Sequence, residues 1–202
     1  MKRFFFAIVL TLIMFSSCSN NNDNQSSTPL TQSEIDDLKF LREEEKLARD
    51  VYLFSYNKYQ VSIFNNISQS EQKHMNSVLN LMNKHGIPDS ASTEIGVFNN
   101  QDLQSLYTGL ITQANISLVE ALKVGATIED LDINDIDDFI GNTTKQDLLN
   151  VYDNLTCGSK NHIRSYTSQL AMNEIIYVPQ YISVEYYNII LSETNGGCGK
   201  NK

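Results

Sequence analysis

Apolar residues recur every three or four positions from about residue 33 to residue 172, which is the spacing of one buried face of an α-helix. We place four long helices at about 33–57, 68–85, 117–131 and 144–172, and a shorter one at about 101–113. Ser33 is the expected N-cap of the first helix because Asp36 follows three residues later, and Gly86 with Pro88 ends the second. With 9 Gly, 3 Pro and no Trp, the chain lacks the composition of a turn-rich β architecture. We therefore predict a single all-α domain.

Some positions on the buried faces carry carboxylate or imidazole groups in place of apolar side chains. Glu71 and His74 lie three residues apart, so both point to the apolar face of the helix at 68–85. His162 and Glu129 fall on the apolar stripes of two other helices. Buried groups of this kind cost free energy unless they are paired, and a metal ion between helices is a common partner. A hydrogen-bonded network within the core is the alternative.

The periodicity leaves two positions open. In the run Glu43-Glu44-Glu45, Glu43 falls on a polar stripe and is expected to face solvent, whereas Glu44 and Glu45 each follow an apolar stripe. Spacing alone does not choose between the latter two. Asp132 lies one turn beyond Glu129, so it either faces inward or caps a separate segment at 134–140.

Four motifs, one in each long helix, carry the candidate ligands. They are Glu45-x-x-Ala48-Arg49-x-x-Tyr52, Glu71-x-x-His74, Gly125 with Glu129, and His162. Together they resemble the ferritin-like superfamily of di-iron or di-manganese carboxylate proteins, with the first motif most similar to the rubrerythrin branch. The resemblance implies a ferritin-like four-helix bundle with additional short helices and a crossing connection between the second and third long helices. It also favours Glu45 over Glu44, because the superfamily's ligand Glu precedes its Tyr by seven residues.

A closer resemblance covers about residues 34–187. The segments that carry it are Glu43 to Tyr52, Ser70 to Met75, Cys157 to His162 and Pro179 to Ser183. They are similar to a ferritin-like domain family of unknown function in bacteria and archaea.

The resemblance implies a site for one or two iron or manganese ions. Its implied ligands are Glu45, Glu71, His74, Glu129 and His162. The superfamily pattern would end in Glu-x-x-His, but here the pair is Ser159 with His162, so one carboxylate is missing. Two divalent ions carry four positive charges, which four carboxylates normally balance. Three explanations stay open: Asp132 supplies the fourth carboxylate, the site holds a single metal, or solvent fills the gap.

The beginning of the chain resembles a bacterial lipoprotein signal. A basic start at residues 1–3 precedes an apolar run at 4–15 that is too short to span a bilayer, and Cys18 follows small residues. The resemblance implies cleavage before Cys18 and lipid on that residue, which would make the membrane a partner and place the protein in the bacterial cell envelope. A plain secretory signal is the alternative. The expected organisation is a signal at 1–17, a flexible tether at 18–32, a helical domain at 33–190 and a tail at 191–202.

Charge and cysteine content limit the other partners. Cleavage would leave 13 of the 15 Lys and Arg residues against 24 Asp and Glu residues, a formal charge of −11, so nucleic acid is excluded as a partner. Self-association into a homo-oligomer is left open. Export would carry Cys157 and Cys198 into an oxidising compartment, where they either form a disulfide that pins the tail or remain two free thiols.

These expectations combine into one leading hypothesis. The chain is expected to be a membrane-anchored, envelope-facing helical bundle that binds iron or manganese and acts as an oxidoreductase on dioxygen or peroxide. The alternatives are a non-catalytic metal-binding or metal-delivery lipoprotein, and a metal-free helical interaction domain. No organic substrate can be named from the sequence.

Overall fold

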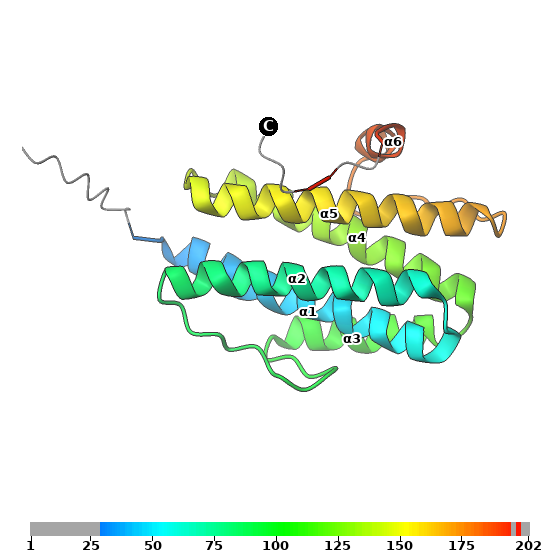
Figure 1. Ribbon diagram of the computed structural model, residues 1–202, viewed down its shortest axis with the longest axis horizontal. Helices are drawn as coiled ribbons and strands as arrows, with labels where there is room; N and C mark the ends of the chain where they lie inside the picture. Colours follow the sequence, from blue (N-terminus) through cyan, green and yellow to red (C-terminus); the bar gives the residue numbers. More distant parts are fainter. Residues whose placement is uncertain (1–28, 195–196, 199–202) are drawn as a thin grey trace, which may run out of the picture.

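The structure is a computed structural model that describes residues 29–194 and 197–198. Within these ranges the chain forms six α-helices and no strand (Figure 1). They are α1 (Gln32–Tyr59), α2 (Ser62–Lys84), α3 (Gln101–Ala114), α4 (Leu118–Gly141), α5 (Gln146–Ala171) and α6 (Val184–Ser192). The prediction of an all-α fold is therefore confirmed.

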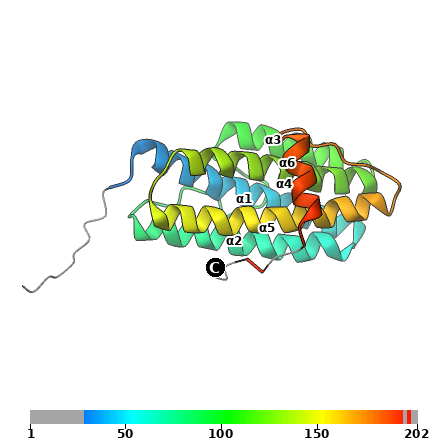
Figure 2. The same cartoon turned by 90° about the horizontal axis from the view of Figure 1, so that it is seen from above.

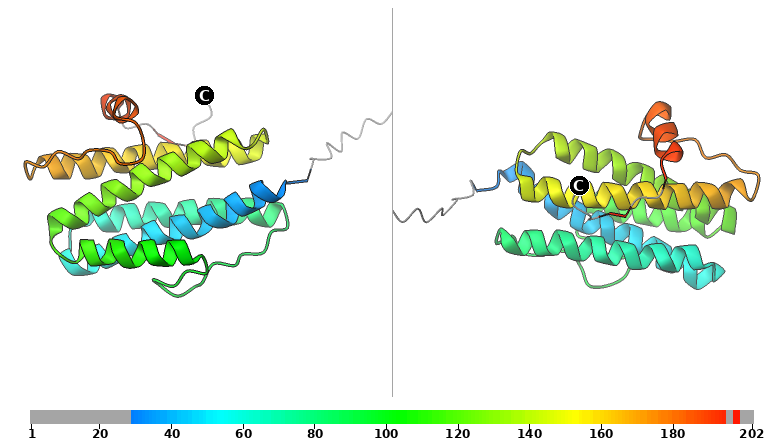
Figure 3. Two further views of the ribbon diagram at one scale, coloured as in Figure 1. Left: turned by 180° about the vertical axis from the view of Figure 1, so that it is seen from behind. Right: turned by 45° about the horizontal axis from the view of Figure 1, so that its top comes forward.

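The four long helices α1, α2, α4 and α5 pack as a bundle. The most extensive packing joins α1 to α2 and α4 to α5, and contacts of α1 with α4 and of α2 with α5 hold the two pairs together. Because α2 and α4 run in the same direction, the segment between them returns along the bundle, and it carries α3 against α1 and α4 (Figures 1 and 3). This is the expected crossing connection. The short α6 crosses the long helices at a steep angle and contacts α5 (Figure 2).

The N-cap of the first helix lies two residues before the predicted one. Thr31, not Ser33, caps α1: its side chain accepts from the Glu34 backbone N–H, and the Glu34 carboxylate accepts from the Thr31 backbone N–H at 2.7 Å. This reciprocal pairing is a capping box, which satisfies two backbone donors that a helix start leaves free. The prediction failed because Ser33 and Thr31 are both good caps, and only Thr31 has a Glu three residues later.

The fourth helix is longer than its apolar pattern suggested. α4 continues past Leu131 without a break, because Ile133 and Ile136 extend its buried face. The second helix also begins earlier than predicted, at Ser62. As a result Asp132 lies inside a helix, and its interpretation as a cap of a separate segment is wrong.

The core consists of two apolar clusters separated along the bundle axis by a layer of polar side chains. α1 contributes Leu38 and Leu41 to one cluster and Leu47 and Val51 to the other. The residues of α1 between them, at 42–46, are all charged and all buried. The other three long helices also contribute to both clusters. Charged side chains from four helices are thus held together in the middle of an apolar bundle.

The carboxyl end of the described chain is tied to α5. Cys157 and Cys198 form a disulfide, with their Cα atoms 5.7 Å apart, which confirms the bonded alternative over two free thiols. The predicted signal segment and Cys18 lie outside the described residues, so the lipid anchor stays a prediction. Among the residues that are described, no helix is both long enough and apolar enough to cross a membrane.

Candidate metal centre

The polar layer contains every residue that the sequence proposed as a ligand. All are buried or nearly so, and each long helix contributes at least one. They are Glu45 from α1, Glu71 and His74 from α2, Glu129 and Asp132 from α4, and His162 from α5. The sequence-predicted set is therefore brought together at one height of the bundle.

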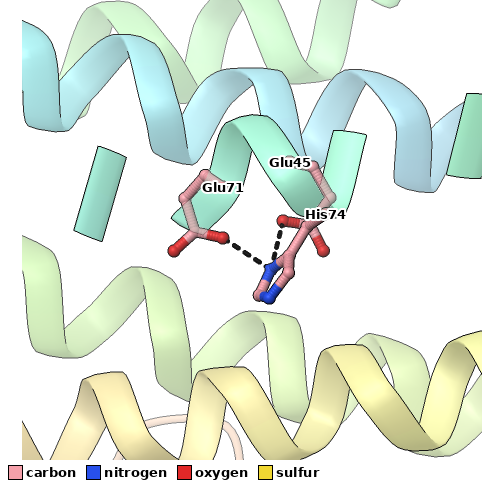
Figure 4. Close-up of side chains that lie close together, drawn as sticks. All are labelled: Glu45, Glu71 and His74. Atoms are coloured by element: carbon pink, nitrogen blue, oxygen red, sulfur yellow. Dashed lines mark hydrogen bonds and ion pairs between the residues drawn. The ribbon is translucent and has the colours of Figure 1, made fainter. Parts of the chain in front are cut away.

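Glu45, Glu71 and His74 form the first group of candidate ligands (Figure 4). The Nδ1 atom of His74 lies 2.7 Å from Glu71 Oε2 and 3.2 Å from Glu45 Oε2. The other oxygen of Glu45 is buried and has no hydrogen-bond donor. Three potential ligand atoms thus converge, and one carboxylate oxygen has no hydrogen-bond partner, as expected of a site for a cation.

Glu71, Glu129 and His162 form the second group. The His162 Nδ1 atom lies 2.8 Å from Glu71 Oε1 and 3.3 Å from Glu129 Oε2. The contact with Glu71 Oε1 is an ion pair without an aligned hydrogen bond. Tyr52 donates its hydroxyl to Glu129 Oε1 at 2.6 Å and so fixes that carboxylate. In both groups the candidate ligand atoms lie within 4.8 Å of one another.

Glu71 belongs to both groups, with one oxygen directed to each histidine. The rings of His74 and His162 are stacked, with centroids 5.6 Å apart. A carboxylate whose two oxygens face two separate imidazoles has the arrangement of a bridging ligand. The set is suited to two cations that share Glu71.

Asp132 completes the set from α4. Ser159 of α5 donates its hydroxyl to Asp132 Oδ2 and to the backbone oxygen of Leu155. The other oxygen of Asp132, Oδ1, is buried without a donor. Asp132 therefore lies beside Ser159, whose hydroxyl holds it in place.

Burial and mutual repulsion act on the carboxylates of the centre. Burial, opposed by His74 and reinforced by Asp132, raises the pKa of Glu45 well above its ordinary value. Burial and the charge of Glu129 raise the pKa of Asp132 to about 7. Burial also raises the pKa of Glu129, against the attraction of His162. In the absence of a cation these acids tend to keep protons.

The histidines respond in the opposite sense. Burial would lower the pKa of His162, but Glu71 and Glu129 outweigh it and raise the pKa to about 10. Glu45 and Glu71 likewise raise the pKa of His74 against burial. Burial would raise the pKa of Glu71, but the two histidines hold it well below its ordinary range. The centre thus attracts positive charge strongly, and protons supply that charge when no metal is bound.

The donor set fits a pair of divalent ions in type and in charge. With neutral imidazoles, the four carboxylates of Glu45, Glu71, Glu129 and Asp132 carry four negative charges, equal to the charge of two divalent cations. Carboxylate oxygen with imidazole nitrogen suits iron and manganese. Asp132 is the fourth carboxylate in this count.

Comparison with known proteins places this centre in a family. The family described as "Uncharacterized protein domain (DUF2202)" matches residues 34–194. The chain belongs to the DUF2202 family. It is 48% identical over 174 residues to "Uncharacterized protein MJ0754" of Methanocaldococcus jannaschii, which covers 85% of this chain and 94% of the relative. The crystal structure of hypothetical protein MJ0754 from Methanococcus jannaschii superposes with a TM-score of 0.82 at 47% identity, over 84% of this chain and 97% of that one.

A glycine of the DUF2202 domain shapes the centre without contributing a ligand atom. A Cβ atom at Gly158 of α5 would lie 2.5 Å from Nε2 of His74. Only glycine therefore lets the His74 ring pack against α5 with its Nδ1 atom turned to Glu71 and Glu45. The sequence signal for this role was the Cys157-Gly158-Ser159 motif, in which a glycine interrupts a helix interior.

Glu44 is a second functional candidate that the sequence left undecided. It is buried, at 3% exposure, beside Glu45, and neither of its carboxylate oxygens has a hydrogen-bond donor. Burial, followed by the charges of Asp132 and Asp135, raises its pKa well above the ordinary value. Glu44 and Glu45 both face inward, toward different neighbours. The spacing left open which of the two is buried, and the structure shows that both are.

Glu43, which the pattern assigned to solvent, is buried, and so are Lys46 and Asp50 on the same helix. Glu43 accepts the backbone N–H groups of Asn99 and Asn100, at 3.1 and 2.8 Å. Lys46 forms a 2.7 Å ion pair with Asp50. The segment before α3 covers this face of α1, so the expectation that Glu43 faces solvent is wrong.

Proposed function

We propose that this DUF2202 domain binds two iron or manganese ions and is an oxidoreductase that reduces dioxygen or peroxide. The observation that carries the proposal is the position of Glu71, whose two oxygens face the two histidines of two three-ligand groups. A network that only satisfied buried groups would not require two such groups to share one carboxylate. The similarity of the motifs to the ferritin-like superfamily supports the same reading.

The surroundings of the centre suit redox chemistry on a small oxidant. Apolar clusters enclose the ligand layer along the bundle axis and limit the access of bulk water. Two bound ferrous ions would supply two electrons, which with two protons convert hydrogen peroxide to two water molecules. Tyr52 and Ser159 hold Glu129 and Asp132 by hydrogen bonds, and this fixes the ligand geometry before any metal binds.

The test begins with metal content. Domain purified after growth with added iron and manganese should contain close to two ions per chain, and Glu71→Gln should contain far less while retaining its helical content. Clean metal-free wild-type protein that also fails to bind added ions would refute the proposal and favour a hydrogen-bonded core network. The catalytic part is tested by anaerobic loading with ferrous iron followed by dioxygen or peroxide. Binding without accelerated iron oxidation would leave a non-catalytic metal-binding or delivery protein.

We also propose that the protein is held at the membrane by lipid on Cys18. Support comes from the basic start, the short apolar run and the small residues before Cys18. In a bacterial host, wild type should partition with membranes and incorporate labelled fatty acid, and Cys18→Ala should do neither. Equal membrane partitioning of the two proteins would contradict the anchor.

A further inference from the structure

An acidic groove opens on the surface near the amino-terminal half of α1 and the carboxyl-terminal part of α4. Its volume is about 440 Å³. It is lined by Asp36, Asp37, Phe40, Asn100, Asp135, Asp138 and Phe139. Four of these seven residues are acids and none is basic. Among the ion pairs of the described residues, none involves the four acids.

Glu44 is a buried acid that interacts electrostatically with Asp135, which lines the groove, and with Asp132, which belongs to the metal centre. Both oxygens of Glu44 are buried and lack a donor. A buried acid with no donor, placed between two other acids, is satisfied best by a cation.

The acids form a continuous series from solvent to the centre. Asp138 is exposed at the groove, Asp135 is half-buried, and Glu44 and Asp132 are fully enclosed. The buried Oδ1 atom of Asp132 has no donor either. Apolar clusters cover the layer on both sides along the bundle axis.

We propose that Glu44 and Asp135 form a third cation site, through which divalent metal ions pass from the acidic groove by way of Asp132 to the metal centre. The inference rests on the proposed function, because it assumes that the centre binds metal. Carboxylate oxygens are the ligands that a hard divalent ion such as Mn²⁺ accepts readily, and a site with two carboxylates attracts it less strongly than a centre with four carboxylates and two imidazoles. A weaker site on the route releases the ion to the centre. The field of the groove raises the local concentration of cations and hence the rate of loading.

The rate of metal loading distinguishes a residue on the entry route from a residue that binds metal in the centre. Metal-free protein is mixed with Mn²⁺ alone, quenched with excess chelator after set times, and assayed for protein-bound manganese. We expect Glu44→Gln to reach the wild-type amount at equilibrium but at least about tenfold more slowly, because the isosteric amide removes charge and keeps shape. Asp138→Lys, which changes only the exposed end of the series, should also slow loading. Asp153→Asn on the exposed side of α5 is the matched control and should load at the wild-type rate.

Direct occupancy provides a second test that does not depend on an intact centre. In the Glu71→Gln background, which damages both ligand groups, millimolar Mn²⁺ should still give one bound ion. Its anomalous scattering should lie between Glu44 and Asp135 in a soaked crystal. The double variant Glu44→Gln with Glu71→Gln should lose that ion. Absence of the ion in Glu71→Gln would overturn the third site.

The remaining outcomes distinguish the two proposals. Wild-type loading rates in both Glu44→Gln and Asp138→Lys would overturn the route and leave the metal centre intact. Loss of one chelator-resistant ion at equilibrium in Glu44→Gln would make Glu44 a ligand of the centre and likewise overturn the route. Failure of wild-type protein to bind any Mn²⁺ or Fe²⁺ would refute the proposed function and, with it, the proposed entry route.

Discussion

Replacing Gly158 by alanine tests whether the centre consists of two separable metal positions. The new Cβ atom would lie 2.5 Å from Nε2 of His74 and 2.6 Å from its Cε1 atom. Ordinary contacts of a Cβ begin at 3.4 Å, so the ring must move by about 0.9 Å, the difference between these two distances. The ring is held on its other side by Glu45 and Glu71.

The size of this shift decides the expected effect. Metal–ligand distances tolerate deviations of only about 0.2 Å. A displacement four times larger should remove His74 from its metal, whereas His162, whose Cε1 atom is 3.9 Å from the same Cβ position, should stay in place. Gly158→Ala should therefore bind one ion where wild type binds two. Overpacking should lower the free energy of unfolding of the metal-free domain by about 1–3 kcal/mol.

Elemental analysis of saturated protein and thermal melts with and without metal provide the assay. At a hundredfold excess over the dissociation constant, each occupied position adds roughly 2.7 kcal/mol to the free energy of unfolding, and Gly158→Ala should lose one such increment. Gly125→Ala would overpack the core to the same degree, with its Cβ 2.5 Å from the Tyr166 ring, but it acts on the side of Tyr52 and Glu129 and should leave His74 in place. Gly109→Ala meets no atom within 4 Å and should be neutral or stabilising. Full metal binding by Gly158→Ala would refute the assignment of His74.

The other expected effects concern charge. Asp132→Asn should lower the affinity for the second ion and leave the helical content, measured by circular dichroism, unchanged. Ser159→Ala should lower the affinity for the same ion by a smaller factor, because it removes only the hydroxyl that holds Asp132. Equal affinities of wild type and both variants would exclude Asp132 from the centre. The double variant Asp132→Ser with Ser159→Glu should still bind two ions. Ser159→Glu alone adds a fifth carboxylate and should lower the stability of the metal-free domain. An unchanged melting temperature of metal-free Ser159→Glu would contradict this. Because Glu71 and Glu129 raise the pKa of His162 from 6.5 to about 10, its charged form stabilises the metal-free fold fully below about pH 6.5, and this stabilisation is lost as the pH rises through 10. The metal-free melting temperature should consequently fall between pH 7 and pH 9 while metal affinity rises, because binding requires the neutral imidazole; a metal-free melting temperature independent of pH would argue against the charged His162.

The ligand positions were accessible to sequence reasoning because they follow local helical geometry. Glu71 and His74 are three residues apart on one helix, and Glu129 and His162 lie on apolar stripes, so each side chain's direction depends only on its own helix. The partner of each ligand was not accessible in this way. That Glu71 serves both histidines depends on the approach of α5 to α2, which no spacing within one helix encodes.

The errors come from contacts between segments far apart in the chain. Glu43 was assigned to solvent because its neighbours on the stripe are charged, yet the backbone at 99–100 binds it. Asp130 of α4, for which no prediction was made, is likewise buried and accepts the backbone N–H groups of Gln180 and Ile182. In both cases a carboxylate satisfies the backbone of an irregular segment, a role that hydrophobic periodicity does not detect.

Asp132 of α4 and Ser159 of α5 face each other in the proposed metal centre. Under the proposed function, Asp132 takes the place of the fourth carboxylate, which the ferritin-like motifs that this chain resembles carry at the position of Ser159. Asp132 is one methylene shorter than glutamate, and the small Ser159 leaves room for it and donates the hydrogen bond that fixes it. The number of carboxylates, and with it the charge available to two divalent ions, is unchanged. The absence of a ligand from one motif is therefore not enough to infer that a metal position is lost, because the facing helix can supply the ligand.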